Sequence, residues 1–375
     1  MQIIKHAMLL LLLLASTVCF AQQQAADTIR WNQRVLINDQ PLVNDTSAGS
    51  VQRNRSKYGS EYCRLLQLKD GSWLAGYTIS RNAGYKADAK GGLELQVSRS
   101  TDNCRSWVPL GTISEPGRDL DNAQLIQLKD GSLLLACRSV RWQESYKLVV
   151  YKSTDMGVLW KPVSIIDENH GQPGELGKPD KGIYEPHMYL LNDGRLSVMY
   201  ANEKHVVEKP SYSQIISQKI SNDLGKTWGT EIWVAHTPGN PASRPGMPVW
   251  TKMKNGKYIV VYEVCSPEEC HIYYKYSDDG INWPVGLGTR IMDQLGGPFV
   301  LSLADGTLVV TSNSSHVSIS RDYGQSWQTI NNSWAKTLWP SLYEVKPGEV
   351  AAVSSEPRAE GGHNVQLRLG IMPKR

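Results

Sequence analysis

Short apolar runs separated by tight-turn dipeptides recur along the whole chain, and no segment shows sustained helical periodicity. Six times, two apolar runs flank an Asp-Gly, Asn-Gly or Pro-Gly dipeptide, a pattern typical of a β-hairpin. The six predicted hairpins span residues 63–77, 123–138, 185–200, 247–263, 299–313 and 339–355. A third strand is expected after each hairpin, as in residues 147–152, 214–220 and 271–276. The pattern predicts an all-β protein.

A second repeat follows most of the third strands and reads Ser-x-Asp-x-Gly-x-Thr-Trp in its fullest form, at Ser221. The other four copies start at Ser100, Ser153, Ser277 and Ser320. The Asp side chain can accept hydrogen bonds from downstream backbone N–H groups, and the Gly can adopt left-handed backbone angles. The Trp then buries a large ring as the fourth strand begins, for example in residues 160–166 and 228–234. We expect these motifs to stabilise turns and to have no catalytic role.

Four antiparallel strands, repeated along the chain, indicate the blades of a β-propeller. The sixth unit has two hairpin strands and a third strand at residues 365–371, but no further motif and no fourth strand. Residues 29–37 precede the first hairpin and have no local partner. We expect this N-terminal strand to complete the sixth blade, because the pairing removes an open sheet edge. The sequence therefore predicts a six-bladed β-propeller over residues 22–375.

The N-terminal sequence predicts that the protein is exported from the cytoplasm. Residues 1–21 have the polar start, apolar core and small final residue of a secretory signal peptide, and the apolar part is too short to span a membrane. We expect export to the periplasm or the extracellular space. The net charge of +4 comes from scattered Lys and Arg side chains, which gives no reason to expect a nucleic-acid partner. We expect a monomer without a membrane span.

Five cysteines remain after removal of residues 1–21, so at least one thiol stays free. Cys265 and Cys270 flank a short hairpin-like segment and can pair in an oxidising compartment. The spacing of Cys, His, Asp and Glu fits no metal pattern, and we expect no metal and no cofactor.

Blade geometry restricts where a site can lie. The hairpin turns and the Ser-x-Asp motifs share one face, and the starts of first strands and the ends of second strands share the other. On that second face the chain places polar residues directly beside apolar runs: Arg64, Asp121, Asn122, Glu185, His187, Glu203, Arg244, Glu263 and Trp339. Carboxylates that converge in a narrow funnel suit general acid/base chemistry, because burial and like-charge proximity separate their pKa values.

The Ser-x-Asp motif resembles the Asp-box, or BNR repeat, of the sialidase-like propellers. Two further segments resemble glycoside hydrolase family 93, the exo-acting 1,5-α-L-arabinanases: Tyr184-Glu185-Pro186 leading to Asn202-Glu203, and Arg244-Pro245-Gly246-Met247-Pro248 leading to Tyr262-Glu263. The resemblance implies a retaining enzyme that releases arabinobiose from the non-reducing end of arabinan. It implies Glu185 as general acid/base and Glu263 as nucleophile. Glu203 stays a candidate for either role, or for modulating the pKa values of the other two.

Further residues are expected to bind the sugar. Arg64, Asp121, Asn122, His187 and Arg244 can hydrogen-bond its hydroxyl groups, and Tyr184, Trp339 and Tyr343 can stack on its faces. The Gly- and Pro-rich residues 167–182 form either a wall that enforces exo action or a solvated connector.

Two alternatives remain open. One is a sialidase-like glycosidase of another glycan specificity, which needs three arginines around a substrate carboxylate. Arg64 resembles the first of these, but the strands before the fourth and fifth Asp-boxes contain no Arg. The other is a non-catalytic glycan-binding propeller, because a fold does not by itself determine a function.

Overall fold

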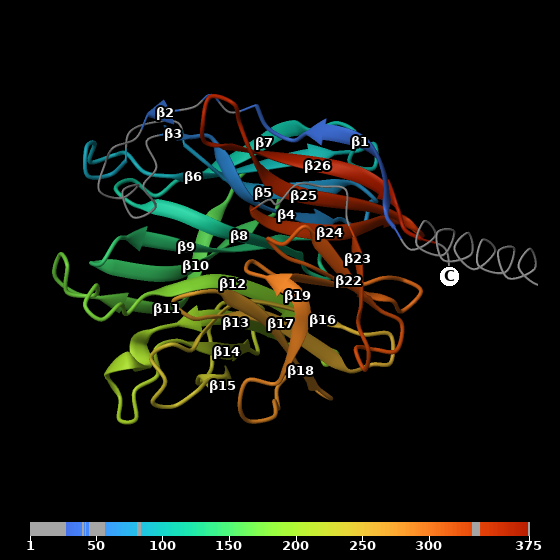
Figure 1. Cartoon of the computed structure of the whole chain (residues 1–375). Helices are drawn as coiled ribbons and strands as arrows, with labels where there is room; N and C mark the ends of the chain where they lie inside the picture. Colours follow the sequence, from blue (N-terminus) through green and yellow to red (C-terminus); the bar gives the residue numbers. More distant parts are fainter. Residues whose placement is uncertain are drawn as a thin grey trace, which may run out of the picture.

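A computed structural model describes residues 28–39, 41, 43–44, 57–80, 84–331 and 338–373. The expected signal peptide, residues 1–21, lies outside this part of the chain. In the described residues the strands form six four-stranded sheets and one two-stranded ladder (Figure 1). Every pairing within these sheets is antiparallel. The predicted all-β, six-bladed propeller is confirmed.

The strands of the first three blades, in chain order, are as follows: β4 (Ser60–Gln67), β5 (Trp73–Ile79), β6 (Glu94–Ser100), β7 (Val108–Ile113); β8 (Asp119–Gln127), β9 (Leu133–Arg141), β10 (Ser145–Ser153), β11 (Lys161–His170); β12 (Ile183–Leu190), β13 (Leu196–Asn202), β14 (Ile215–Ser221), β15 (Ile232–Ala235). The strands of blades four to six are as follows: β16 (Arg244–Lys252), β17 (Tyr258–Cys265), β18 (Cys270–Ser277), β19 (Thr289–Leu295); β20 (Phe299–Ser302), β21 (Leu308–Thr311), β22 (His316–Ser320), β23 (Gln328–Asn331); β24 (Leu338–Lys346), β25 (Glu349–Pro357), β26 (His363–Ile371), β1 (Arg30–Leu36). The small ladder pairs β2 (Val43–Asn44) with β3 (Lys57–Tyr58), and one 3₁₀ turn covers Lys204–Val207.

The N-terminal strand closes the ring. β1 pairs antiparallel with β26, with Arg34 opposite Arg368, so the sixth blade contains both ends of the described chain. The blue β1 lies beside the red β26 in Figure 1. The predicted completion of the last blade by the N-terminus is confirmed, and the pairing covers the edge that β26 would otherwise expose.

The Asp-box motifs form the expected turns. In the third copy the Ser221 hydroxyl donates to Asp223 (2.8 Å) and accepts from the Gly225 N–H (2.7 Å). Asp223 Oδ1 also accepts from the Thr227 N–H at 2.9 Å. These bonds satisfy the backbone of the turn between the third and fourth strands.

One strand boundary in blade three was predicted wrongly. The fourth strand was expected to start at Trp228, but β15 begins at Ile232. The reason is that the Trp228 indole donates to Ser164 of blade two at 3.1 Å, so its side chain packs onto the neighbouring blade. The Gly229 N–H donates to Ile220 O, and the regular pairing of β15 with β14 starts only at Ile232, opposite Gln218.

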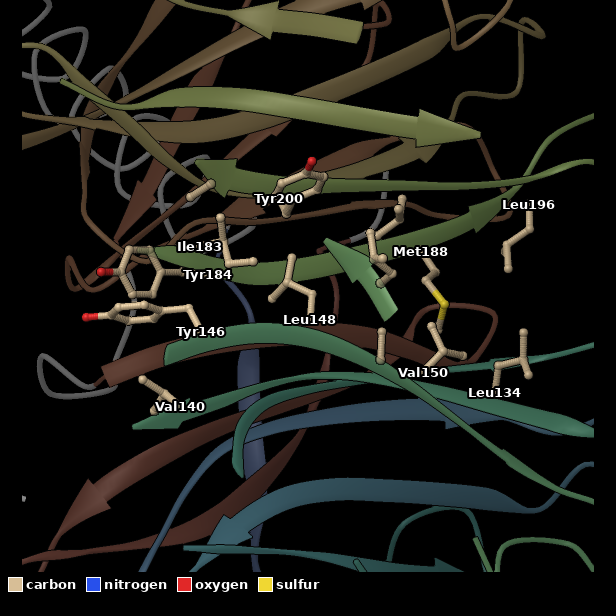
Figure 2. Close-up of a cluster of buried hydrophobic side chains, with 14 of the residues drawn as sticks. Leu134, Val140, Tyr146, Leu148, Val150, Ile183, Tyr184, Met188, Leu196 and Tyr200 are labelled. Carbon is tan, nitrogen blue, oxygen red and sulfur yellow. The ribbon is translucent and has the colours of Figure 1, made fainter. Parts of the chain in front are cut away.

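Apolar contacts between adjacent blades form the core. Six clusters of buried side chains are present in the described residues, and one of them joins blades two and three. Figure 2 shows Tyr146 and Tyr184 side by side at one end of this cluster, with ring centroids 5.6 Å apart. The first strand of each blade is therefore held between neighbours on both sides, which gives the funnel rigid walls.

Cys265 and Cys270, whose pairing the sequence left open, form a disulfide bond. Cys63, Cys104 and Cys137 are free and buried. In the described part of the chain no helix is both long and apolar enough to cross a membrane.

Candidate active site

In five blades the first strand is interrupted at an equivalent place by a residue with positive φ, and in blade five the equivalent residue lies just before β20. These six residues are Tyr62 (52°), Asn122 (58°), Glu185 (60°), Met247 (49°), Gly297 (53°) and Trp339 (51°). In five of the six blades the strand ladder shifts register there. A side chain in this backbone region costs roughly 1–2 kcal/mol, and such strain is typical of functional sites. We call these positions the bulge layer.

The bulge layer brings Glu185 and Glu263 to one short segment of β16. The Glu185 carboxylate accepts from the Met247 N–H at 2.8 Å. Gly246, the preceding residue, is the ladder partner of Glu263 in β17. The Glu185 carboxylate of blade three therefore reaches this segment, and Glu263 of blade four pairs with it through the backbone.

A side chain at Gly246 would displace the Gln214 amide from its present position. A Cβ there would lie 2.5 Å from Gln214 Nε2 and 3.6 Å from Glu185 Oε2. Gln214 in turn donates to Pro245 O at 2.8 Å, which fixes the backbone next to the carboxylates.

Glu263 is held by the next blade. Its Oε2 accepts from the Gly297 N–H at 2.7 Å. Burial raises the pKa of Glu263, while the Gly297 N–H and the Arg244 guanidinium oppose that rise. A Glu263 oxygen and the sulfurs of Cys265 and Cys270 lie within 4.8 Å of one another, but the sulfurs are bonded to each other and offer no thiolate to a metal.

Glu203 lies deeper than the other two carboxylates, with an exposed fraction of 1%. It accepts hydrogen bonds from the Gly182 N–H (2.9 Å) and the Tyr184 hydroxyl (3.0 Å), and it forms an ion pair with Arg244. Burial raises the pKa of Glu203, and the charge of Arg244 opposes this effect. With three donors already bound, Glu203 is placed to organise Arg244 and Tyr184. The Gly182 bond also ties the end of residues 167–182 to the site.

Asp121 and Arg138 form a second buried ion pair, at 3.0 Å. Asp121 Oδ1 also accepts from the Thr78 hydroxyl and from the Asn122 N–H, both at 2.7 Å. The Asn122 side-chain oxygen is buried without a hydrogen-bond partner. The pair fixes the blade-two wall of the funnel, and the Asn122 amide is its available polar group.

Arg64 and His187 lie two residues beyond the bulge in their strands, one layer deeper along the funnel axis. Together with Gln124 and Phe299 they line a cavity of about 380 Å³ between the first strands. Burial and the charge of Arg64 lower the pKa of His187 to about 3, so the imidazole is neutral. His187 therefore lines the deeper cavity, whereas the Arg64 side chain starts there and its guanidinium reaches back to the bulge residues Tyr62 and Trp339.

The predicted aromatic platforms also divide between the two layers. Trp339 is a bulge residue. Its backbone N–H donates to Asn313 Oδ1 (2.7 Å), and its ring centroid lies 5.8 Å from that of Tyr62. Tyr343 lies further along β24 and packs against Phe299, with ring centroids 5.1 Å apart, beside the deeper cavity.

Sequence reasoning missed two site residues, Tyr62 and Gln214, whereas the turn at Gly297 and Asn313 lie at strand ends that it places on this face. The sequence carries a signal for the bulge layer, because four of its six residues directly precede a proline: Glu185, Met247, Gly297 and Trp339. Proline lacks the N–H that a regular ladder needs, so a proline repeated at the start of first strands marks an interruption.

A larger cavity, of about 760 Å³, opens beside the bulge layer at blades four and five. Gly296, Asn313 and Leu338 line its inner end, and Glu268, Glu269 and Asp293 are among its outer residues. The site therefore combines paired carboxylates, aromatic rings and adjacent space for a chain-like ligand.

The arginines around the funnel do not form a free carboxylate clamp. Arg138 is paired with Asp121 and Arg244 with Glu203, so each positive charge is already balanced. Arg64 lies in the deeper layer and donates to the Cys63 and Trp339 carbonyl oxygens.

No protein-family model and no curated protein matches this chain. Solved structures do resemble it. α-L-Arabinanase from Penicillium chrysogenum, complexed with arabinobiose, is 24% identical with a TM-score of 0.74, over 90% of this chain and 98% of that one. The GH93 α-L-arabinofuranosidase of Fusarium graminearum, also with arabinobiose, is 21% identical with a TM-score of 0.73, over 90% and 97%. NanB sialidase from Streptococcus pneumoniae is 11% identical with a TM-score of 0.58, over 89% and 70%. At these identities the similarity shows that this chain shares their fold.

Proposed function

We propose that this protein is a retaining, exo-acting glycoside hydrolase that cleaves α-1,5-linked L-arabinan from its non-reducing end and releases arabinobiose. The observation that carries the proposal is that Glu185 accepts from the Met247 N–H while Glu263 is the ladder partner of the adjacent Gly246, on the face opposite the Asp-boxes. The two proteins of similar fold that were solved with arabinobiose support the choice of sugar.

The chemistry needs one acid/base and one nucleophile. We assign the first role to Glu185, which protonates the departing glycosidic oxygen as that bond breaks. Glu263 attacks the anomeric carbon and forms a glycosyl–enzyme ester. Water then attacks the same carbon, Glu185 takes its proton, and the ester bond to Glu263 breaks. The Gly297 N–H and Arg244 assist by favouring the ionised form of Glu263.

Substrate contacts are assigned by layer. Asn122, Arg244 and Trp339 are assigned to supply hydrogen bonds and an aromatic face to the sugar. Tyr184 is packed in the core and supports Glu203. The cavity of about 760 Å³ next to Gly296 and Asn313 gives the rest of the glycan room to leave the funnel. We assign residues 167–182, which the Gly182 N–H ties to Glu203, as the wall that favours cleavage near a chain end.

The first experiment is hydrolysis of linear 1,5-α-L-arabinan by the purified protein, with products separated by chromatography. Arabinobiose should be the main product, with the anomeric configuration retained by NMR. Release of a different sugar from another glycan would refute the arabinan assignment, and binding without hydrolysis across a broad glycan panel would favour a non-catalytic propeller. A sialidase is disfavoured because Arg138 and Arg244 are already ion-paired.

The second experiment separates the two carboxylate roles, with an aryl arabinobioside whose leaving group needs no protonation. Glu185→Gln should still form the glycosyl–enzyme, and azide should then restore turnover because it needs no general base. Glu263→Gln should show no such rescue with retained configuration. If both variants keep wild-type rates on arabinan, the assigned site is wrong. A crystal structure should also show these carboxyl groups about 5–5.5 Å apart.

We also propose that residues 1–21 direct export and that the mature protein is a monomer. N-terminal sequencing of the secreted protein should begin at Gln22, and light scattering should give the mass of one chain.

A further inference from the structure

The cation in the deeper layer of the funnel is unusual for its surroundings. Arg64 is buried, with an exposed fraction of 3%. Its Nη1 donates to the carbonyl oxygens of Cys63 (3.0 Å) and Trp339 (3.1 Å), but Nη2 is buried without a hydrogen-bond partner. No carboxylate of the described residues forms a salt bridge with this guanidinium, whereas Arg138 and Arg244 each have one. A buried charge is normally paired, because desolvation is otherwise costly.

Aromatic rings contact the guanidinium but do not use its N–H groups. The guanidinium carbon lies 4.3 Å from the ring centroid of Tyr62 and 5.5 Å from that of Phe299. Such cation–π contacts favour a positive charge at this place, and they leave the in-plane donors of Nη2 for another acceptor.

The neighbouring cavity is suited to a small acceptor. Arg64, Gln124 and His187 contribute its polar groups, and His187 Nδ1 is also buried without a partner. The remaining lining is mostly aliphatic and aromatic, and no Asp or Glu of the described chain contributes to it. Arg64 therefore contributes a positively charged side chain to the wall of a cavity of about 380 Å³ with a largely apolar lining.

We propose that Arg64 and His187 bind a small monovalent anion, such as chloride, in this axial cavity beneath the carboxylate layer. A single negative charge balances the one guanidinium, whereas a doubly charged oxyanion would leave an uncompensated charge in an apolar space. The anion accepts from Arg64 Nη2 and from an imidazole N–H of His187. This inference is independent of the glycosidase assignment.

The test measures anion-dependent stability of the full-length mature protein without glycan. Chloride replaces gluconate stepwise at constant ionic strength, and Tm is followed by circular dichroism. Wild type should show a saturable rise in Tm on the order of a few °C, because an anion that binds only the folded state stabilises it. Arg64→Met should lose the response and His187→Leu should weaken it.

Arg105→Met is the matched control, because Arg105 is half-exposed and paired with Glu349 at an Asp-box turn. It removes one positive charge elsewhere and should keep the full chloride response. Anomalous diffraction from a bromide-soaked wild-type crystal is the second readout, and it decides the question even if Arg64→Met does not fold. A peak between Arg64 and His187 supports the proposal. A map without that peak, or a chloride response that survives in His187→Leu and Arg64→Met alike, overturns it.

Discussion

Replacing Glu203 with alanine should destabilise the protein strongly, because it removes the acceptor for three donors at once. Two of them, the Gly182 N–H and the Tyr184 hydroxyl, are buried and lie 2.9 and 3.0 Å from Glu203. The third, Arg244, has a side chain that is 44% exposed and can turn to water.

The size of the effect follows from these exposures. Each buried donor left without an acceptor costs about 1–3 kcal/mol. The loss of a half-exposed ion pair adds about 0–1 kcal/mol. We therefore expect the free energy of unfolding to fall by about 2–7 kcal/mol in Glu203→Ala.

A double-mutant cycle with Tyr184→Phe tests the physical cause. Phenylalanine has no hydroxyl that could lose its acceptor. Glu203→Ala should therefore lower the free energy of unfolding by about 1–3 kcal/mol less in the Tyr184→Phe background. The assay is urea unfolding at pH 7, with free energies from linear extrapolation.

Tyr262→Phe provides the control, because the Tyr262 hydroxyl donates to Leu287 O in blade four and makes no bond to Glu203. Its effect should simply add to that of Glu203→Ala. Equal coupling in both cycles, or a loss below 1 kcal/mol in Glu203→Ala, would show that the buried bonds do not hold this part of the site.

Three other predictions concern the carboxylates and the opposite face. Arg244→Met should move the acidic limb of the kcat/KM profile to higher pH, since the guanidinium lowers the pKa of Glu263; a limb that stays in place or moves to lower pH would contradict the charge argument. Gly246→Ala should reduce kcat/KM about 10–100-fold with an unchanged circular dichroism spectrum, because the new Cβ meets Gln214 at 2.5 Å and shifts the backbone next to Met247, whose N–H binds Glu185. Near wild-type activity would show that the segment tolerates the substitution. Asp223→Ala should lower Tm but leave kcat/KM unchanged. The Thr227 hydroxyl and N–H bonds hold the pKa of Asp223 at about 2, below its ordinary value. The difference in Tm should therefore be full above about pH 5 and be lost as the pH falls through about 2. A difference that stays constant from pH 5 to below pH 2 would assign the effect to something other than the ionised carboxylate.

The blade count and the closure of the ring were predictable from sequence because their determinants are local. An Asp-Gly turn between apolar runs specifies a hairpin wherever it occurs, and the Ser221–Asp223 motif closes its own turn with bonds between near neighbours. Counting such units leaves the sixth blade one strand short, and β1 is the strand that fills it. Glu185 and Glu263 could also be predicted from the sequence as candidate catalytic residues, because a carboxylate directly beside an apolar strand is conspicuous.

The arrangement of the site was decided by contacts between blades, which leave little trace in local sequence. Glu203 and Arg244 belong to different blades, and their pairing with each other instead of with substrate depends on the packing angle of those blades. The positive φ of Glu185 aims its carboxylate at the Met247 N–H, while His187, two residues later, faces the axial cavity. Periodicity alone places Arg64, His187 and Glu185 together at strand starts. Only the tertiary structure separates them into two layers, because depth along the funnel axis is set by the register of six strands that meet from distant parts of the chain.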